Sequence, residues 1–277
     1  MTLRAERPAG GAELREALYG GAIFRLPATP GSRRLTAEAV AHIEAELGGD
    51  VRKAQFRLTG EEFFRRVGRL RKAFYSEEAF RAHVRCLLAE QGMDEGRTAF
   101  DPIRLRAVPH RGFENPAAAP VYFAHRDTWY AHPQAAINWW VPLHDVTEEE
   151  TFTFYTDCFD RPVPNDSDRF DYDAWARHGL ALRIGWQDPS HGRTHHYPGQ
   201  AGPFDPGRAL SFAASAGEIL LFAGAHFHQT RHNTTGRTRF SLDFRSVDLG
   251  DAAAGRGAPN ADDRSTGSAL PSYVQPV

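Results

Sequence analysis

The sequence has few of the residues that mark secreted, disulfide-bonded or membrane proteins. Its 277 residues include only two cysteines, Cys86 and Cys158, too few for a disulfide framework. The N-terminus has no apolar core of signal-peptide length, and no window approaches the roughly 18 consecutive apolar residues of a membrane span. We therefore expect a cytoplasmic protein with no membrane partner.

The chain also lacks a large net charge of either sign. Its formal charge at pH 7 is −2 and its pI is about 6.7, so bulk charge does not favour binding to nucleic acid or an anionic membrane. Lysine is scarce, because only Lys53 and Lys72 occur among 33 basic residues. The apolar content of 41% is enough to bury a sizeable core. Composition does not indicate the oligomeric state.

Helical patterns come first along the chain. Thr36 is a plausible N-cap for a helix over residues 37–47, and apolar spacing over 61–91 predicts two helices that break near Ser76. Beyond Gly92, short apolar runs divided by Pro, Gly and Asn are typical of strands. The expected strands are 102–108, 120–125, 136–143, 151–155, 181–185, 218–223 and 238–246.

We expect a single domain over residues 1–277, of β-rich α+β class. Its helical region, 1–98, would pack on a sandwich or barrel formed by 99–247. A long insertion, 145–215, would interrupt the barrel. In the tail, 248–277, the chain from Gly250 reads as loop or disorder until Tyr273 and Val274.

The stretch around His125-Arg126-Asp127 has metal-ligand character. On a strand, His125 and Asp127 have the same parity, so an imidazole and a carboxylate would project from one face. His228, which follows the apolar strand 218–223, would complete two histidines and one carboxylate around a metal. That ligand set suits non-haem Fe(II) oxygen chemistry.

The strand expected at 238–246 alternates between apolar and polar side chains. Its apolar side would present Phe240, Leu242 and Phe244. Its polar side would present Arg239, Ser241, Asp243 and Arg245. Polar groups in that number on an inward face are costly unless they are satisfied by one another or by a ligand, so a polar cavity is expected. A guanidinium at Arg239 could hold a carboxylate by two parallel hydrogen bonds, with Ser241 as an extra donor.

This combination resembles the Fe(II)/2-oxoglutarate-dependent oxygenases, particularly the phytanoyl-CoA dioxygenase-like branch, over residues 99–247. His125, Asp127 and His228 match the family's metal ligands, and Arg239 with Ser241 matches its R-x-S motif for the far carboxylate of 2-oxoglutarate. The resemblance implies a double-stranded β-helix, which is a jelly-roll or cupin-like barrel, buttressed here by the N-terminal helices. It also implies Fe(II), 2-oxoglutarate and O2, with release of succinate and CO2.

Other residues are candidates for the same site. Asn138 and Trp140 share parity on the strand 136–143, and we expect them beside 2-oxoglutarate. Arg245 is a candidate substrate contact that could instead pair with Asp243. The pair His226 and Arg237 has the same spacing as His228 and Arg239, and leaves the ligand register open by parity. The family's pattern, with Asn233 five residues after His228 and Ser241 two after Arg239, favours His228, with His226 as a cavity residue.

The insertion begins with an acidic segment. Residues 145–173 contain ten carboxylates against two arginines, a formal charge of 2 − 10 = −8. A solvated surface is one interpretation. The other is a negative rim that attracts a cationic substrate through residues such as Asp157 and Asp160.

The sequence therefore predicts an oxygenase that hydroxylates or oxidatively cyclises a small molecule. We expect a cationic natural product, such as an amino-sugar, aminoglycoside or amino-acid-derived antibiotic precursor. Two alternatives are a Zn or Mn cupin-type lyase or isomerase, and an inactive barrel that binds a small molecule.

Overall fold

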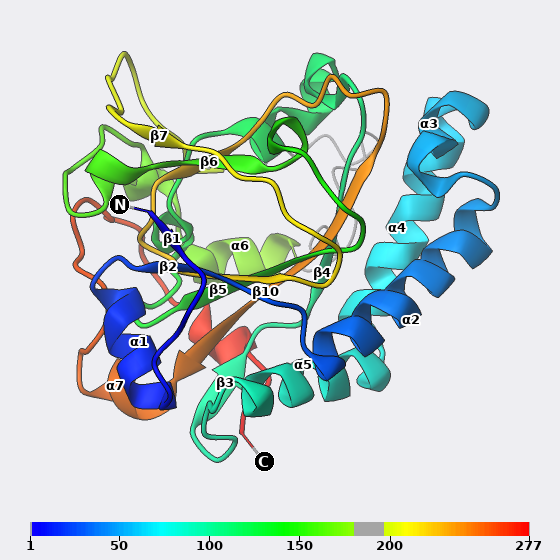
Figure 1. Cartoon of the computed structure of the whole chain (residues 1–277). Coiled ribbons are helices and arrows are strands. Elements are labelled where there is room, and N and C mark those ends of the chain that lie inside the picture. The colour runs from blue at the N-terminus through cyan, green and yellow to red at the C-terminus, as the bar shows by residue number, and fades with distance from the viewer. Residues whose placement is uncertain (1, 180–196, 277) are drawn as a thin grey trace.

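The computed structural model describes residues 2–179 and 197–276, which form a mixed α+β structure (Figure 1). The helices are α1 (Gly11–Tyr19), α2 (Pro30–Leu47), α3 (Ala54–Arg57), α4 (Gly60–Ser76), α5 (Glu78–Glu90), α6 (Tyr172–Gly179) and α7 (Leu249–Ala253). The strands are β1 (Leu3–Arg4), β2 (Ile23–Leu26), β3 (Thr98–Phe100), β4 (Arg104–Val108), β5 (Ile137–Pro142), β6 (Phe152–Tyr155), β7 (Ala209–Leu210), β8 (Ile219–Ala223), β9 (His228–Thr230) and β10 (Arg239–Asp248). No described helix has the length and apolar composition needed to cross a bilayer.

The described strands form two sheets and do not close into one hydrogen-bonded barrel. The larger, seven-stranded sheet has the order β1-β2-β8-β5-β10-β3, with β4 also paired to β10. The smaller sheet has the order β7-β6-β9. One apolar cluster joins the two sheets, because it takes Trp140 and Phe222 from the larger sheet and Phe152 and Phe154 from the smaller one.

The other face of the large sheet packs on the N-terminal helices, as expected. Phe240, Leu242 and Phe244 of β10 lie in one apolar core with buried residues of α2, α4 and α5. Figure 1 shows these three helices together on one side of the molecule. The predicted alternation of β10 is therefore confirmed on its apolar side, and its polar side faces away from the helices.

The structure confirms the two helices predicted over 61–91 as α4 and α5. The predicted helix 37–47 is α2, which starts earlier: Thr29 is its N-cap, with the side-chain oxygen accepting from the Ser32 backbone N–H at 3.1 Å. Thr36, the predicted cap, lies inside the helix. The helix ends at Gly48, whose φ of 66° is a conformation that glycine adopts readily.

The strand predicted at 120–125 is wrong. Residues Pro116–Tyr122 form a 3₁₀ helix, and His125 makes only an isolated β-bridge. Pro120 lies inside that 3₁₀ helix and has no N–H to donate to a sheet. The strand predicted at 181–185 lies outside the described residues.

The C-terminal tail after α7 is mostly loop and turn, as its composition predicts, but it is bound to the rest of the chain and is not disordered. Asp251 in α7 pairs with Arg15 of α1 at 2.6 Å. Near the end of the chain, Tyr273 is buried, and its hydroxyl lies 2.9 Å from Nδ1 of His132. Paired charges and a buried aromatic ring therefore order a segment that has few apolar residues.

Glu150 gives a test of the fold that is independent of function. Its side chain is buried and pairs with Arg52 and with Arg237, the latter at 3.2 Å. We expect Glu150→Gln to lower the free energy of unfolding by about 3 kcal/mol, because both guanidinium groups lose their counter-charge. The exposed neighbour Glu149 is the control. Urea denaturation of both variants checks this, and equal midpoints for the two would contradict it.

Candidate metal and 2-oxoglutarate site

Two of the three predicted metal ligands lie side by side. The backbone N–H of His125 donates to the carbonyl of His228, and the reverse bond is also made, each at 3.0 Å. The centroids of the two imidazole rings are 4.5 Å apart. His228 begins β9, so the bridge brings the segment after the 3₁₀ helix against the edge of the smaller sheet.

Both imidazoles present the same nitrogen for coordination. Nδ1 of His125 donates to the carbonyl of Phe123 at 2.8 Å, and Nδ1 of His228 donates to the carbonyl of His226 at 3.0 Å. Burial lowers the pKa of His125, and it lowers the pKa of His228 to about 3 with a further contribution from His125. Both rings are therefore neutral at pH 7, with Nε2 available as an electron-pair donor, as in histidines that bind metals.

Asp127, the third predicted ligand, is held by other groups. Its backbone N–H donates to the carbonyl of Gly224 at 2.9 Å, and its two carboxylate oxygens accept from Arg245 and Asn138. Burial acts to raise the pKa of Asp127, but Arg245, His228 and His125 outweigh it and hold that pKa well below its usual range. Within the described residues, no three His, Cys, Asp or Glu side chains are close enough together to hold a metal.

Arg245 lies between two buried carboxylates. Its Nη1 donates to Asp101 at 2.9 Å, and its Nη2 donates to Asp127. Its backbone N–H also donates to Asp101, which pairs with Arg104 at 2.8 Å as well. The structure thus places Arg245, a predicted substrate contact, against the carboxylate predicted to bind the metal.

Arg239 and Ser241 are buried and carry polar atoms that have no hydrogen-bond partner among the described residues. Arg239 is 3% exposed, and its Nε and Nη1 have no hydrogen-bond partner among the described residues. The Ser241 hydroxyl, on the same side of β10, is likewise buried and without a described partner. Burial lowers the pKa of Arg239 to about 10, with Arg106 adding to the effect. A buried guanidinium without an anion is costly, so this pair of side chains has the character of an anion site.

Trp140 and Asn138 occupy different parts of this face. The Arg239 guanidinium carbon lies 6.0 Å from the ring centroid of Trp140, whose Nε1 is buried without a described partner. Asn138 lies opposite Arg245 in the β5–β10 register, beside Asp127. Trp140 therefore lies near the predicted 2-oxoglutarate anchor, and Asn138 near the predicted metal carboxylate.

The alternative register, His226 with Arg237, is placed elsewhere. Both ring nitrogens of His226 face carbonyl oxygens, that of Ala223 at 3.0 Å and that of Gly21 at 3.1 Å. Arg237 is half-exposed and pairs with Glu150. His228 is the histidine beside His125.

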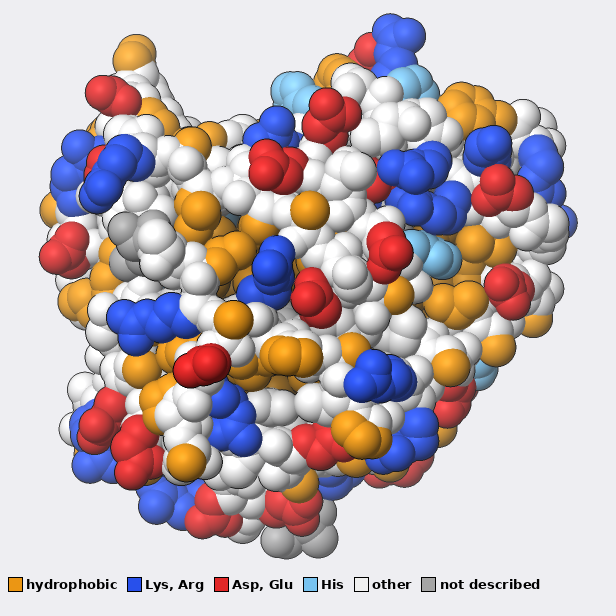
Figure 2. Space-filling model, viewed as in Figure 1, with side chains coloured by type: hydrophobic (Ala, Val, Ile, Leu, Met, Phe, Trp, Pro, Cys, Tyr) orange, Lys and Arg blue, Asp and Glu red, His pale blue; other side chains and the backbone are white. Residues whose placement is uncertain are grey.

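The acidic segment is partly neutralised by arginines outside it. Asp157 pairs with Arg208 at 2.7 Å, and Glu150 pairs with Arg52 and Arg237. Asp160 is exposed. Figure 2 shows acidic and basic side chains interspersed over one face of the molecule, with apolar side chains exposed near its centre. With Asp168, which pairs with Arg264 at 3.4 Å, these carboxylates form ion pairs within the fold, while Asp160 and others of the segment have no ion pair among the described residues.

Sequence reasoning missed two residues that support the site, Asp101 and Arg126. Asp101 fixes Arg245 from a loop that carries no motif, and no sequence signal identifies it. Arg126 stands between two predicted ligands and is 1% exposed. Its place between His125 and Asp127 did not predict this burial, because on a strand its side chain would point away from the two predicted ligands.

The comparisons with known proteins find similar chains among solved structures. No protein-family model and no curated protein matches the chain. Among similar solved structures is ThoJ, a non-heme monooxygenase, at 15% identity and a TM-score of 0.45, covering 84% of this chain and 76% of ThoJ. EvdO2 from Micromonospora carbonacea var. aurantiaca has 16% identity and a TM-score of 0.45, covering 88% of this chain and 94% of EvdO2.

A third similar structure is SnoN, an epimerase, in complex with Fe3+, α-ketoglutarate and nogalamycin RO. It has 18% identity and a TM-score of 0.44, covering 90% of this chain and 96% of SnoN. All three structures are at most 18% identical to this chain and have TM-scores below 0.5, so no conclusion about the function of this chain follows from them. What each of them binds is a property of that protein.

Proposed function

We propose that the chain is an Fe(II)- and 2-oxoglutarate-dependent oxygenase that oxidises a small natural product. The observation that carries the proposal is the buried Arg239 guanidinium, which has donors without described partners beside the equally unpartnered Ser241 hydroxyl. A carboxylate matches both, because a guanidinium binds it through two parallel hydrogen bonds. The neutral imidazoles of His125 and His228 supply the nitrogen ligands that iron accepts.

Each side chain has a distinct task in this proposal. Fe(II) and 2-oxoglutarate, when bound, supply with O2 the oxidising power that protein side chains lack. His125 and His228 would hold the metal through Nε2, and Asp127 would be the carboxylate ligand once it exchanges its bond to Asn138 or Arg245 for the metal. Arg239 and Ser241 would orient 2-oxoglutarate by its far carboxylate.

Apolar rings line one side of the proposed metal site. The rings of Phe152, Phe154 and Phe222 lie against its imidazole, with centroids 5.7, 6.2 and 5.4 Å away. Apolar rings at this distance lower the local dielectric and leave few groups to hydrogen-bond water. These three rings would therefore limit the access of water from their side of the site.

The test of the proposed function is succinate release. The purified chain is incubated with 2-oxoglutarate, O2 and either Fe(II) or Zn(II), and with a panel of amino sugars, amino acids, nucleosides and acyl thioesters. We expect succinate only with Fe(II), and more of it with a preferred substrate. Zn(II)-dependent conversion of a panel member without succinate would replace the proposal with a lyase or isomerase.

A cationic substrate remains a prediction from the acidic segment 145–173. Exposed charges attract each other over roughly 8 Å at physiological ionic strength, so the apparent substrate affinity should weaken as salt rises. Because Asp157 is already paired with Arg208, the larger effect is expected from Asp160→Asn, with the 2-oxoglutarate requirement unchanged. An affinity that is indifferent to salt and to both substitutions would assign the segment to the scaffold alone.

A further inference from the structure

Arg126 lies between two predicted metal ligands and uses its whole guanidinium group. Its Nε donates to Asp262 at 3.0 Å. Its Nη1 donates to the carbonyls of Phe159, at 3.1 Å, and Ala225. Its Nη2 donates to those of Cys158, at 2.6 Å, and Arg161, at 2.9 Å. A guanidinium has five N–H donors, and all five are used here at a side chain that is 1% exposed.

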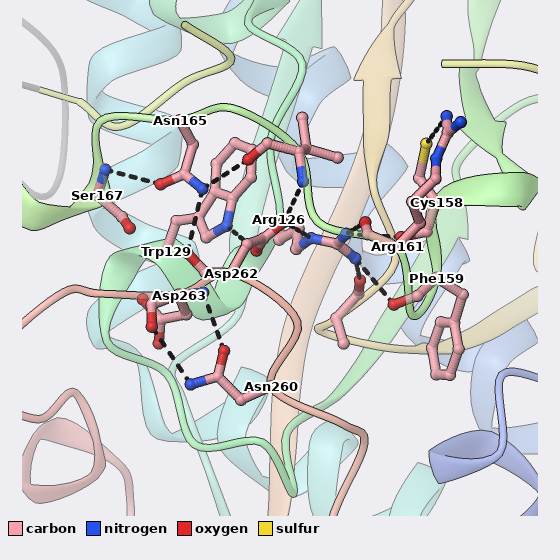
Figure 3. Close-up of polar contacts among 12 residues, drawn as sticks. Arg126, Trp129, Cys158, Phe159, Arg161, Asn165, Ser167, Asn260, Asp262 and Asp263 are labelled. Carbon is pink, nitrogen blue, oxygen red and sulfur yellow. Dashed lines mark hydrogen bonds and ion pairs between the residues drawn. The ribbon is translucent and has the colours of Figure 1, made fainter. Parts of the chain in front are cut away.

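These acceptors come from three parts of the chain that are distant in sequence. Cys158, Phe159 and Arg161 belong to the insertion after β6. Ala225 belongs to the turn that leads to His228, and Asp262 belongs to the C-terminal tail. Figure 3 shows Arg126 at the meeting point of the insertion and the tail.

Asp262 supplies the only carboxylate among these acceptors. Its side chain is 4% exposed, and besides Arg126 it accepts from Trp129 Nε1 at 2.7 Å and from the Val163 backbone N–H at 2.8 Å. Trp129 lies in the 3₁₀ helix Asp127–Tyr130, which begins at a predicted ligand. Asp262 therefore holds the segment that carries His125 and Asp127 at two points.

We propose that Asp262 is a positioning residue for the metal ligands. Through Arg126 and Trp129, it fixes the His125–Asp127 segment against the turn that delivers His228. The inference rests on the proposed function, since it concerns ligands to Fe(II). It assigns to the C-terminal tail a part in the metal centre that its sequence does not suggest.

The effect of removing this carboxylate follows from its charge. Asp262→Asn keeps the size and one oxygen acceptor of the side chain but leaves the buried Arg126 cation without a counter-charge. Moving toward water then lowers the free energy of the Arg126 cation. Because His125 and Asp127 lie on either side of residue 126, this movement would displace two of the proposed ligands. Changes in outer partners of this kind typically cost about 10- to 100-fold in metal affinity.

The experiment measures Co(II) binding to the full chain by competition with a chelating dye, together with the Co(II) visible spectrum and the thermal midpoint. The variants are Asp262→Asn, Trp129→Phe and the control Asp251→Asn. Asp251 is a suitable control because it is also a buried tail carboxylate, paired with Arg15 and Arg256, but it does not contact the ligand segment.

We expect Asp262→Asn to weaken Co(II) binding by about tenfold or more and to change the spectrum. Trp129→Phe, which removes one hydrogen bond to Asp262, should weaken it by about threefold, and this variant decides the question if Asp262→Asn does not fold. Asp251→Asn should lower the thermal midpoint while leaving Co(II) affinity unchanged. Unchanged Co(II) affinity in both Asp262→Asn and Trp129→Phe, or an equal loss in Asp251→Asn, would overturn the positioning role alone. A wild-type chain that binds no Co(II) would overturn the proposed function with it.

Discussion

Replacing His228 with alanine should lower Fe(II) affinity by more than about a hundredfold, since even outer partners of a metal are worth 10- to 100-fold. The reason is that His228 and His125 lie side by side with each Nδ1 already bound to a carbonyl, so that each ring has its Nε2 left for the metal. The second imidazole, His125, cannot hold the metal in its place with one carboxylate. Anaerobic Fe(II) titration with a chromophoric chelator as competitor measures the loss.

His226→Ala is the matched control for this experiment. His226 is two residues away, is buried, and directs both ring nitrogens to carbonyl oxygens. The variant should be less stable, because a buried ring is lost, but should still bind Fe(II). Unimpaired Fe(II) binding in His228→Ala, with loss in His226→Ala, would shift the ligand register by two residues.

Arg239→Lys should raise the concentration of 2-oxoglutarate needed for half-maximal binding by about 10- to 100-fold. A lysine ammonium keeps the charge but cannot reproduce two parallel hydrogen bonds, and one hydrogen bond to a charged group is worth roughly 1.5–3 kcal/mol. Burial magnifies the effect, because Arg239 is 3% exposed and its Nε and Nη1 have no partner among the described residues. Calorimetric titration of 2-oxoglutarate into the Fe(II)-loaded protein under argon measures the dissociation constant of 2-oxoglutarate.

Arg237→Lys serves as the control, since Arg237 is half-exposed and already pairs with Glu150. It should leave the 2-oxoglutarate requirement unchanged and cost only a little stability. An exchange of the two phenotypes would favour His226 as the metal ligand, because Arg237 and His226 share the spacing of the preferred pair.

Periodic patterns predicted the parts of the fold in which one face of an element is buried. The helices α4 and α5 and the alternation of β10 follow from where apolar side chains recur, and the structure contains all three. The same alternation placed Arg239 and Ser241 together on the polar side of one strand. A strand of ten residues fixes such relationships by its geometry alone.

Prediction failed where long-range polar contacts decide the structure. His125 and Asp127 do not lie on a strand. Their segment is held instead by backbone bonds to His228 and Gly224 and by the Arg126 side chain. Asp101, about 140 residues from Arg245 in sequence, has no local signal either. The tail was predicted to be loop or disorder because its residues are small and polar. Its carboxylates, such as Asp251, nevertheless bind it to arginines of other elements.

The most direct test of the account is an anaerobic absorption titration. The wild-type chain, Arg239→Lys and His228→Ala are each mixed with Fe(II) and titrated with 2-oxoglutarate, and the visible charge-transfer absorption of iron-bound 2-oxoglutarate is recorded. We expect the wild-type chain to give a band that saturates at one equivalent of 2-oxoglutarate. In Arg239→Lys the same band should appear only at much higher 2-oxoglutarate concentrations. In His228→Ala it should be absent. A wild-type chain that binds Fe(II) but gives no band at any 2-oxoglutarate concentration would contradict it.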